Sequence, residues 1–465
     1  MSNRSTLMLG QIFKALGQEA PQEVEFVGAD PVFPLALPVG EAGAATIAAS
    51  GVAAADLWQL RTGRRQDVSI DVDAAAAAMR SANYLRLEPS PGQKPPVPRV
   101  IRNHDIYRTK DGRWLYLHRE FAHHRARIAQ LLRCADEPEA IAAVVSNWQA
   151  TELEDAVFQC GACAGLIRSY QEWDRSDQGR AVAGLPLLSI SQIVNSPAEN
   201  LPAGDRPLSG IRVLDLTRVL AGPTCARTLA EHGADVLRIG AAQLPNNERH
   251  IIDTGHGKRS AVLDLDQQAG LDQLCSLVGD SDVFSQSYRP GSMAARGFSF
   301  ESVAAMRPGI IYVSLSAFGP EGPWRERRGF DTLVQTVSGI SHEYALDGKP
   351  RLLPVSALDY MTGYLAAFGA LVALGRRARE GGSYHVEISL AQTAHWLTSQ
   401  ERCSPDKVMA APEDLSLDRI AALSTTTETP FGRLQHLAPA VQLRETPARW
   451  ERPAVPLDHD QPGWL

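Results

Sequence analysis

The sequence is poor in cysteine for its length and has no long, uninterrupted apolar run. Six cysteines in 465 residues are too few for a disulfide framework, so we expect a reducing compartment, the cytoplasm. The start of the chain lacks the apolar core and cleavage site of a secretory signal. The most apolar stretch, which follows Asp359, is broken by Gly363, Tyr364, Gly369 and Gly375, so a membrane span is not expected.

Excess positive charge is also missing. The formal net charge of −7 gives no general attraction to nucleic acid or to an anionic membrane. The turn DLTRVLAGP has no G-x-G-x-x-G, and neither G-x-S-x-G nor H-E-x-x-H occurs. An anionic ligand would therefore need a local site, and no metal is expected.

From Leu208 onward, short apolar stretches alternate with helical ones. A turn containing Ala221-Gly222-Pro223 leads into a helix that is expected to end near Gly233. The expected strands are 211–216, 234–239, 260–265, 282–287 and 309–316. This alternation predicts a Rossmann-like α/β large domain, in which a parallel sheet is covered on both faces.

The stretch from about residue 99 to 190 has a different pattern. Asp105 to His118 reads as a hairpin with its turn at 110–112, and helical patterns follow. We expect a smaller α+β domain between proline-rich linkers at 91–98 and 197–207. The expected divisions are 1–98 (a back-half large-domain segment), 99–200 (small domain), 207–400 (large α/β domain) and 401–465 (a C-terminal segment). After Ala411 we expect extended chain on a surface.

An internal repeat relates the first segment to the large domain. Subtracting 318 places Asp359 on Glu41, Gly369 on Gly51 and Gly381 on Gly63. It also places the V-x-I of 386–388 on that of 68–70. Alanine-rich helices can resemble one another by chance, but the matched glycines and V-x-I spacing favour a true repeat.

Asp359 stands at the front of an apolar helical run, where removing a carboxylate from water is costly. One interpretation is a helix N-cap, because Asp accepts hydrogen bonds from the free N–H groups at a helix start. The other is that this carboxylate performs chemistry.

Several short motifs allow both a functional and a structural interpretation. Lys258-Arg259 beside flexible glycines could hold phosphate groups, and so could Tyr288, Arg289 and Arg296 around a Pro-Gly turn, although basic loops are often only solvated. The pair Cys160 and Cys163 lacks the second ligand pair of a zinc site, and we expect two packed small residues. His123-His124 is expected on the solvated face of a basic helix.

Taken in order, these segments resemble a known family. They are LSGIRVLDLTRVLAGPTCARTLAEHGADVLRI, GKRSAVLDL, DVFSQSYRPGSMAARGF, PGIIYVSLSAFGPEGPW, RGFDTLVQTVSGI and PVSALDYMTGYLAAFGALVAL. Together they resemble the class III CoA-transferases, a group that includes formyl-CoA transferase, carnitine CoA-transferase and the α-methylacyl-CoA racemases. In that family the small domain follows the catalytic helix, whereas here small-domain-like sequence precedes the large domain.

The resemblance implies that Asp359 is the nucleophile of a formyl-CoA transferase-like enzyme. Such an enzyme moves CoA from an acyl-CoA donor to a carboxylic acid through aspartyl anhydride and aspartyl-CoA thioester intermediates. It also implies acyl-CoA and a small acid as partners, and a homodimer, possibly interlocked. The CoA contacts that the resemblance implies are Leu220, Ala221, Leu263, Asp264, Leu265, Asp266, Ser287, Tyr288, Arg289, Arg328, Gly329, Phe330 and Asp331. The basic residues Lys258, Arg259 and Arg296, singled out above, are added to this set.

Two alternatives stay open. Racemases on this scaffold commonly carry a second proton carrier, a histidine, at the position of Phe330, so transfer ranks above racemisation. A rearranged paralogue could also keep the fold without turnover. Glu41 in the first copy is expected to be a relic or a structural acid rather than a second nucleophile.

Overall fold

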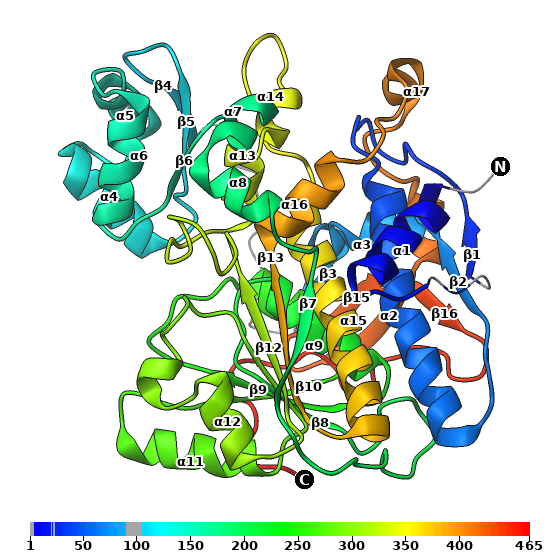
Figure 1. Ribbon diagram of the computed structural model, residues 1–465. Coiled ribbons are helices and arrows are strands. Elements are labelled where there is room, and N and C mark those ends of the chain that lie inside the picture. The colour runs from blue at the N-terminus through cyan, green and yellow to red at the C-terminus, as the bar shows by residue number, and fades with distance from the viewer. Residues whose placement is uncertain (1–3, 20, 22–23, 90–104) are drawn as a thin grey trace.

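The computed structural model describes residues 4–19, 21, 24–89 and 105–465 (Figure 1). The expected linker prolines between 91 and 98, and the expected start of the small domain at 99, lie outside the described residues.

A seven-stranded sheet forms the centre of the large domain. Its order is β10-β9-β8-β11-β12-β13-β7, with six parallel strands and β7 antiparallel to β13 at one edge. The strands are β7 (Ser189–Val194), β8 (Arg212–Asp215), β9 (Asp235–Gly240), β10 (Lys258–Val262), β11 (Val283–Gln286), β12 (Ile311–Ser316) and β13 (Ser383–Ser389). The five strands expected after Leu208 and the α/β fold class are confirmed.

Helices cover both faces of this sheet because successive strand residues point to opposite sides. Leu214 and Phe284 pack with α11 and α12 on one face, whereas Val213 and Val283 pack with α9 and α15 on the other. The covering helices are α9 (Ala221–Glu231), α11 (Gln268–Gly279), α12 (Phe300–Met306) and α15 (Ala357–Glu380).

By length and composition, α15 could cross a membrane, with a mean hydropathy of 1.4 in its most apolar window. That window is 94% buried inside the protein. We therefore describe α15 as the core helix of the molecule, in contact with α2, α9 and β13.

The small domain is confirmed as an α+β unit. Its sheet has the order β4-β5-β6, and the predicted hairpin turn contains Gly112 at φ 74°. The elements are β4 (Ile106–Arg108), β5 (Trp114–Leu117), α4 (Ala122–Leu132), α5 (Pro138–Val145), α6 (Ala150–Gln159) and β6 (Ala164–Leu166). In Figure 1 this domain stands at one end of the molecule, above the main sheet.

The internal repeat appears in the structure at the expected offset. Helix α2 (Val39–Thr62) and helix α15 are both 24 residues long, and their ends coincide when 318 is subtracted. Gly63 and Gly381 follow the two helices with φ of 76° and 77°. Strand β2 (Val68–Asp71) then takes the place of β13, and α2 lies against α15 (Figure 1).

The two repeats exchange their last strands. Strand β7, which ends the first repeat, pairs antiparallel with β13 of the second. Strand β16 (Val441–Leu443), near the end of the second repeat, pairs antiparallel with β2 of the first, whose other edge holds β1 (Val24–Val27) in parallel. Strand pairing thus joins the two repeats within one chain, and the interlocked arrangement of two subunits stays a prediction. The homodimer itself stays a prediction.

The segment after Ala411 is more ordered than expected. It contains α18 (Leu417–Ala422) and a hairpin of β14 (Ser424–Thr429) and β15 (Gly432–Leu437), which adds β3 (Arg86–Pro89) from the first repeat. The threonine-rich alternation of 424–429 is typical of an exposed strand. The last residues run as extended chain over the large domain, as predicted.

Candidate active site

Asp359 lies in the first turn of α15, at the edge where the parallel strands end. This placement follows because α15 runs back across the sheet and leads into the start of β13. Ligands of open parallel sheets bind at this carboxyl edge. Asp359 is 8% exposed, which fits a group shielded from bulk water.

Asp359 is not the N-cap residue of its helix, because Ser356 occupies that position and makes no side-chain capping bond. The free N–H groups of the helix start are satisfied by Asp331 instead. Its Oδ2 accepts hydrogen bonds from Leu358 N at 2.9 Å and from Asp359 N at 3.1 Å. The capping interpretation therefore belongs to Asp331, which is 3% exposed.

Gln335, one turn further along α13 (Asp331–Val337), fixes the Asp331 carboxylate in turn. The Gln335 amide donates to Asp331 Oδ1, and its oxygen accepts from Leu353 N at 2.8 Å. This chain of bonds locks the start of α15 against α13. Asp331, expected as a CoA contact, is thus a buried positioning group under the helix that carries Asp359.

Asp359 lies in the first turn of α15. The start of an α-helix carries a partial positive charge, which stabilises negative side chains in the first turn.

The first repeat forms one wall beside the start of α15. Ser356 N donates to Met79 O at 3.1 Å, and Tyr360 Oη accepts from Ala82 N at 3.2 Å. Tyr360 Oη also donates to Asp253 Oδ2 at 2.9 Å. Both repeats therefore build the surroundings of Asp359.

The small domain approaches from the other side. The His118 ring stacks on the Phe330 ring at 4.2 Å and 11°, and His118 N donates to Cys163 O at 3.0 Å. Cys163 and Ile167 pack with Leu333 of α13. No sequence motif pointed to His118. Its one signal was its position at the end of the predicted hairpin.

The loops with the expected CoA contacts converge at the carboxyl edge of the sheet. Arg218 N donates to Ser287 Oγ at 3.3 Å, and Arg296 Nη2 lies 2.7 Å from Asp266 Oδ1. Within these loops Leu220 and Leu263 are buried, whereas Asp264, Asp266, Arg289 and Arg296 are exposed. Tyr288, Leu265, Ala221, Gly329 and Phe330 are half-buried.

Lys258 and Arg259 do not belong to this open edge as phosphate ligands. Lys258 is 2% exposed and lies 2.8 Å from both Asp215 Oδ2 and Pro223 O. Arg259 pairs with Asp235 at 3.0 Å and donates to Gly463 O. Both cations are neutralised inside the fold, which argues against the expectation that they bind phosphate.

Two smaller expectations change as well. His123 and His124 lie in α4 as predicted, but His124 is 1% exposed, and burial lowers its pKa to about 3. The expectation of a solvated pair is therefore wrong for His124. Cys160 and Cys163 are free thiols on the turn after α6, with Cys163 packed in the interior as expected.

Val219, which we did not predict, carries backbone strain in the first strand-to-helix loop. Its φ is 69°, a conformation that β-branched residues rarely adopt. Such outliers are typical of functional loops, and this one directly precedes the expected CoA contacts Leu220 and Ala221.

The matching position in the first repeat has a similar backbone frame, and its carboxylate lies in an ion pair. Asp30 Oδ2 accepts from Glu41 N at 2.6 Å, as Asp331 does from Asp359. However, Arg4 Nη1 lies 2.8 Å from Glu41 Oε2 and also donates to Cys403 Sγ at 3.6 Å. An arginine thus occupies the carboxylate of Glu41, which fits a structural acid.

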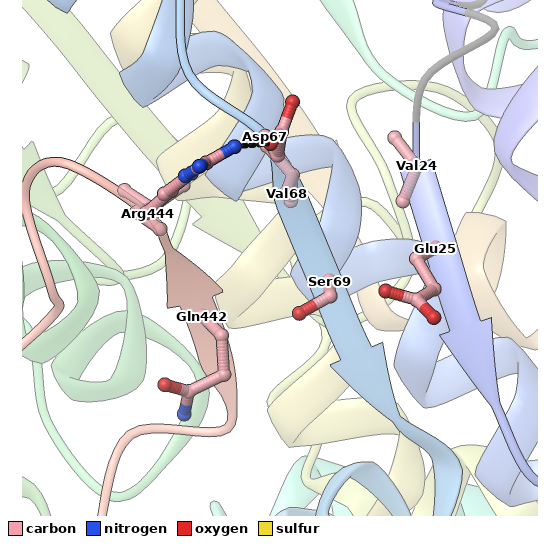
Figure 2. Close-up of a pocket in the computed structure, with 8 residues that line it drawn as sticks. Val24, Glu25, Asp67, Val68, Ser69, Gln442 and Arg444 are labelled. Carbon is pink, nitrogen blue, oxygen red and sulfur yellow. Dashed lines mark hydrogen bonds and ion pairs between the residues drawn. The ribbon is translucent and has the colours of Figure 1, made fainter.

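A pocket lies elsewhere, on the β1-β2-β16 sheet (Figure 2). There Arg444 pairs with Asp67 at 3.1 Å, and none of the predicted site residues lines it. Among the described residues, no group of three or more His, Cys, Asp or Glu side chains is arranged to hold a metal ion.

Comparisons with known proteins agree with this geometry. Acetyl-coenzyme A transferase nodX of Hypoxylon pulicicidum is 33% identical over 318 residues, which cover 63% of this chain and 54% of that protein. An acyl-CoA transferase of Gibberella moniliformis is 30% identical over 385 residues, covering 73% and 67%. The succinyl-CoA–L-malate CoA-transferase beta subunit of Chloroflexus aurantiacus is 31% identical over 221 residues, covering 44% and 52%. The chain spans between about half and two thirds of the length of these relatives.

A family model described as CoA-transferase family III matches residues 27–198 and 208–416. The first range contains α2 and the small domain, and the second contains strands β8 to β13 and helix α15. Together the two ranges cover most of the chain. The chain belongs to CoA-transferase family III.

Proposed function

We propose that this protein moves CoA from an acyl-CoA donor to a carboxylic acid acceptor, with Asp359 as the nucleophile. The observation that carries the proposal is the placement of this carboxylate: buried, in the first turn of a core helix, at the carboxyl edge of a parallel sheet. The printed names of the relatives, which are acetyl-, acyl- and succinyl-CoA transferases, support acyl-CoA as the donor class.

The reaction proceeds in four balanced steps. A carboxylate oxygen of Asp359 attacks the thioester carbon, and CoA leaves as a thiolate to give a mixed anhydride. The thiolate then attacks the Asp359 carbonyl, which releases the donor acid and leaves an aspartyl-CoA thioester. The acceptor carboxylate forms a second anhydride and frees the thiolate again. Attack of the thiolate on the acceptor acyl carbon yields the new acyl-CoA and restores Asp359.

Water must be kept from these intermediates because anhydrides hydrolyse readily. Three parts of the protein surround the proposed site. The first repeat contacts the start of α15 through Met79 and Ala82, the small domain stacks His118 on Phe330, and the large domain lies beneath. A formyl-CoA transferase-like subtype, a cytoplasmic location and a homodimer are part of the same proposal.

Paired variants test the assignment. Asp359→Asn removes the nucleophile, and we expect loss of CoA exchange by at least a thousandfold with the fold retained. Glu41→Gln changes the equivalent carboxylate of the first repeat and serves as the matched control, with exchange expected to persist. Circular dichroism and thermal unfolding confirm that both variants fold. Exchange that survives in Asp359→Asn would refute the assignment.

Trapping of the intermediate gives an independent measurement. Incubation of the wild type with acyl-CoA and hydroxylamine should convert Asp359 to a hydroxamate, which peptide mass spectrometry detects. An unmodified Asp359 peptide, in a protein that turns over, would reject the covalent route.

One observation favours a second candidate, racemisation or isomerisation of an acyl-CoA. The His118 imidazole, 4.2 Å from the Phe330 ring, brings a proton carrier close to the Asp359 segment. Exchange of the α-hydrogen of an acyl-CoA with solvent deuterium, without CoA transfer, would select this function. Neither exchange nor transfer with any acyl-CoA would select the non-catalytic paralogue.

A further inference from the structure

The side chain of Tyr360, the residue after Asp359, ends in a buried cluster of polar groups. Its hydroxyl donates to Asp253 Oδ2 at 2.9 Å and accepts from Ala82 N at 3.2 Å. Ser81 Oγ lies 3.0 Å from the same hydroxyl and donates to Asp253 Oδ1 at 2.7 Å. Tyr360 is fully buried, so these bonds replace those that its hydroxyl would make with water.

Arg227 balances the charge of this cluster. Its Nη1 atom donates to Asp253 O at 2.9 Å and lies 3.3 Å from Asp253 Oδ2. Both side chains are buried, and a buried charge is costly unless it is paired and hydrogen-bonded. Burial, and then Asp253, raise the pKa of Tyr360 well above its usual value. The hydroxyl therefore keeps its proton at neutral pH and remains a donor to the aspartate.

The cluster joins segments that are far apart in the sequence. Ser81 belongs to η1 (Ser81–Tyr84) of the first repeat, and Asp253 belongs to α10 (Glu248–Thr254) of the large domain. Tyr360 brings α15 to both of them. The helix that carries the proposed nucleophile is thus tied by one side chain to the first repeat and to the large domain.

This cluster restrains a rotation that the Asp331 cap resists only weakly. Asp331 accepts the N–H groups of Leu358 and Asp359, which lie close to the helix axis, so these bonds hold the helix end in place but have a short lever arm about the axis. The Tyr360 hydroxyl lies at the far end of a long side chain and has a longer lever arm. Neighbouring residues of an α-helix are about 100° apart around its axis. A rotation of the first turn that moves Tyr360 therefore turns Asp359 by the same angle.

The first repeat shares the backbone cap but differs at the position of the tyrosine. A carboxylate accepts the N–H group of the acid in both repeats. Subtracting 318 places Tyr360 on Ala42, which has no hydroxyl. A tyrosine held by hydrogen bonds thus follows the acid proposed to react, whereas an alanine follows Glu41, the acid paired with Arg4.

We propose that Tyr360, held by Asp253 and Ser81, sets the rotation of the first turn of α15 and so aims the Asp359 carboxylate at the thioester carbon. This inference rests on the proposed function. Tyr360 and its partners are positioning residues, because they act through the helix and not on the substrate. Reacting groups must be held within about 0.5 Å and about 10–20° of the productive geometry. A displacement of about 1 Å can lower a rate by about a hundredfold.

Two tyrosine variants with the same chemical change test this role. Tyr360→Phe keeps the ring and removes the hydroxyl, and we expect kcat to fall about ten- to hundredfold, with an unchanged KM for acyl-CoA. Tyr84→Phe is the matched control, because Tyr84 is also buried and its hydroxyl donates to Asp414 Oδ1 at 2.6 Å. Both variants should unfold at a lower temperature than the wild type, but kcat should fall only in Tyr360→Phe. The rates are measured at a temperature at which circular dichroism shows all three proteins folded.

A double variant shows whether the cluster acts as a unit. Ser81→Ala removes one partner of the Tyr360 hydroxyl and leaves the ion pair of Arg227 and Asp253 intact. We expect a lower kcat in Ser81→Ala. If the two residues act together, the combined variant should be no slower than Tyr360→Phe alone. Effects on kcat that multiply would contradict a shared positioning role.

The rate of hydroxamate formation at Asp359 in a single turnover separates failure of this inference from failure of the proposed function. Slower trapping in Tyr360→Phe than in the wild type and Tyr84→Phe supports the positioning role. Equal trapping rates in all three proteins reject that role and leave the proposed function standing, and an equal decrease in both variants also rejects it. Absence of the hydroxamate in the wild type rejects the proposed function and this inference with it.

Discussion

At the residue scale, the position of Asp359 depends on a second carboxylate. Asp331 accepts two N–H groups at the start of α15 and is itself held by Gln335. Asp331 thus organises the helix start that carries Asp359, the proposed nucleophile.

Replacing Asp331 should therefore affect both stability and rate. Asp331→Ala leaves two buried N–H groups without their acceptor, and we expect a loss of about 1–3 kcal/mol in the free energy of unfolding. Denaturant titration measures this change, and steady-state kinetics should show a lower kcat. A change in the free energy of unfolding below about 0.5 kcal/mol would contradict the capping role.

Charges also show what the sequence could and could not predict at this scale. Asp359 stood out because a lone acid in an apolar run has few structural uses. Lys258 and Arg259 were misleading because their partners, Asp215 and Asp235, lie far away along the chain. Pairing of that kind depends on strand order, which a local motif does not encode.

At the scale of elements, the two long helices approach their strands at equivalent glycines. A Cβ atom on Gly51 would lie 2.6 Å from Val441, and one on Gly369 would lie 2.5 Å from Val386. The second neighbours, Val68 and Leu188, are also within 3.3 Å. The glycine spacing that revealed the repeat is thus required by close packing of helix on sheet.

Alanine at either glycine should destabilise the protein to a similar extent. We expect a loss of about 1–3 kcal/mol for Gly51→Ala and for Gly369→Ala, because a methyl group would overpack a buried contact. Gly10→Ala in α1 (Arg4–Ala15) is the control, since no atom lies within 4 Å of the added Cβ, and a gain of about 0.4–1 kcal/mol is expected. Thermal unfolding of the three variants measures these changes, and a loss at one glycine alone would argue against equivalent packing.

At the scale of the whole molecule, buried histidines couple stability to pH. Burial lowers the pKa of His385 from 6.5 to about 4, so the unfolded chain takes up this proton first as the pH falls. The free energy of unfolding should then decrease between pH 6.5 and 4, by up to about 1.4 kcal/mol per pH unit for this group. Glu231, whose pKa burial raises from 4.5 to about 8, acts in the opposite sense between those two values, because the unfolded chain loses this proton first as the pH rises.

The contribution of His385 is isolated by comparison with His385→Gln, whose amide retains a polar partner for Ser314. The variant should show a flatter dependence of unfolding free energy on pH in the same window, and the two curves should run parallel above pH 7. Curves that are parallel throughout would show that His385 takes up its proton equally in both states.

Strand exchange predicts how the molecule responds to a cut. A protease site inserted at the exposed residues 203–205 separates the repeats covalently, but β7 stays paired with β13, and β16 with β2. We expect the two fragments to co-elute in gel filtration and to separate only in denaturant. Separation without denaturant would show that these pairings contribute little to the association.

The order of segments could be predicted from the sequence. The pairing of a strand from each repeat with the sheet of the other could not. Strand pairing between Val441 and Ile70, or between Ile190 and Val386, leaves no local pattern, because short edge strands look alike wherever they dock. The contact of the small domain with Phe330 and Leu333 was equally hidden.

The exchange also sets an order of events for a chain emerging from the ribosome. Strand β2 is made early, yet one of its final neighbours is β16, close to the other end of the chain. Strand β7 likewise waits for β13. Nascent chains therefore expose an unfinished strand edge until residues 441–443 have left the exit tunnel, which is when a chaperone would be of most use.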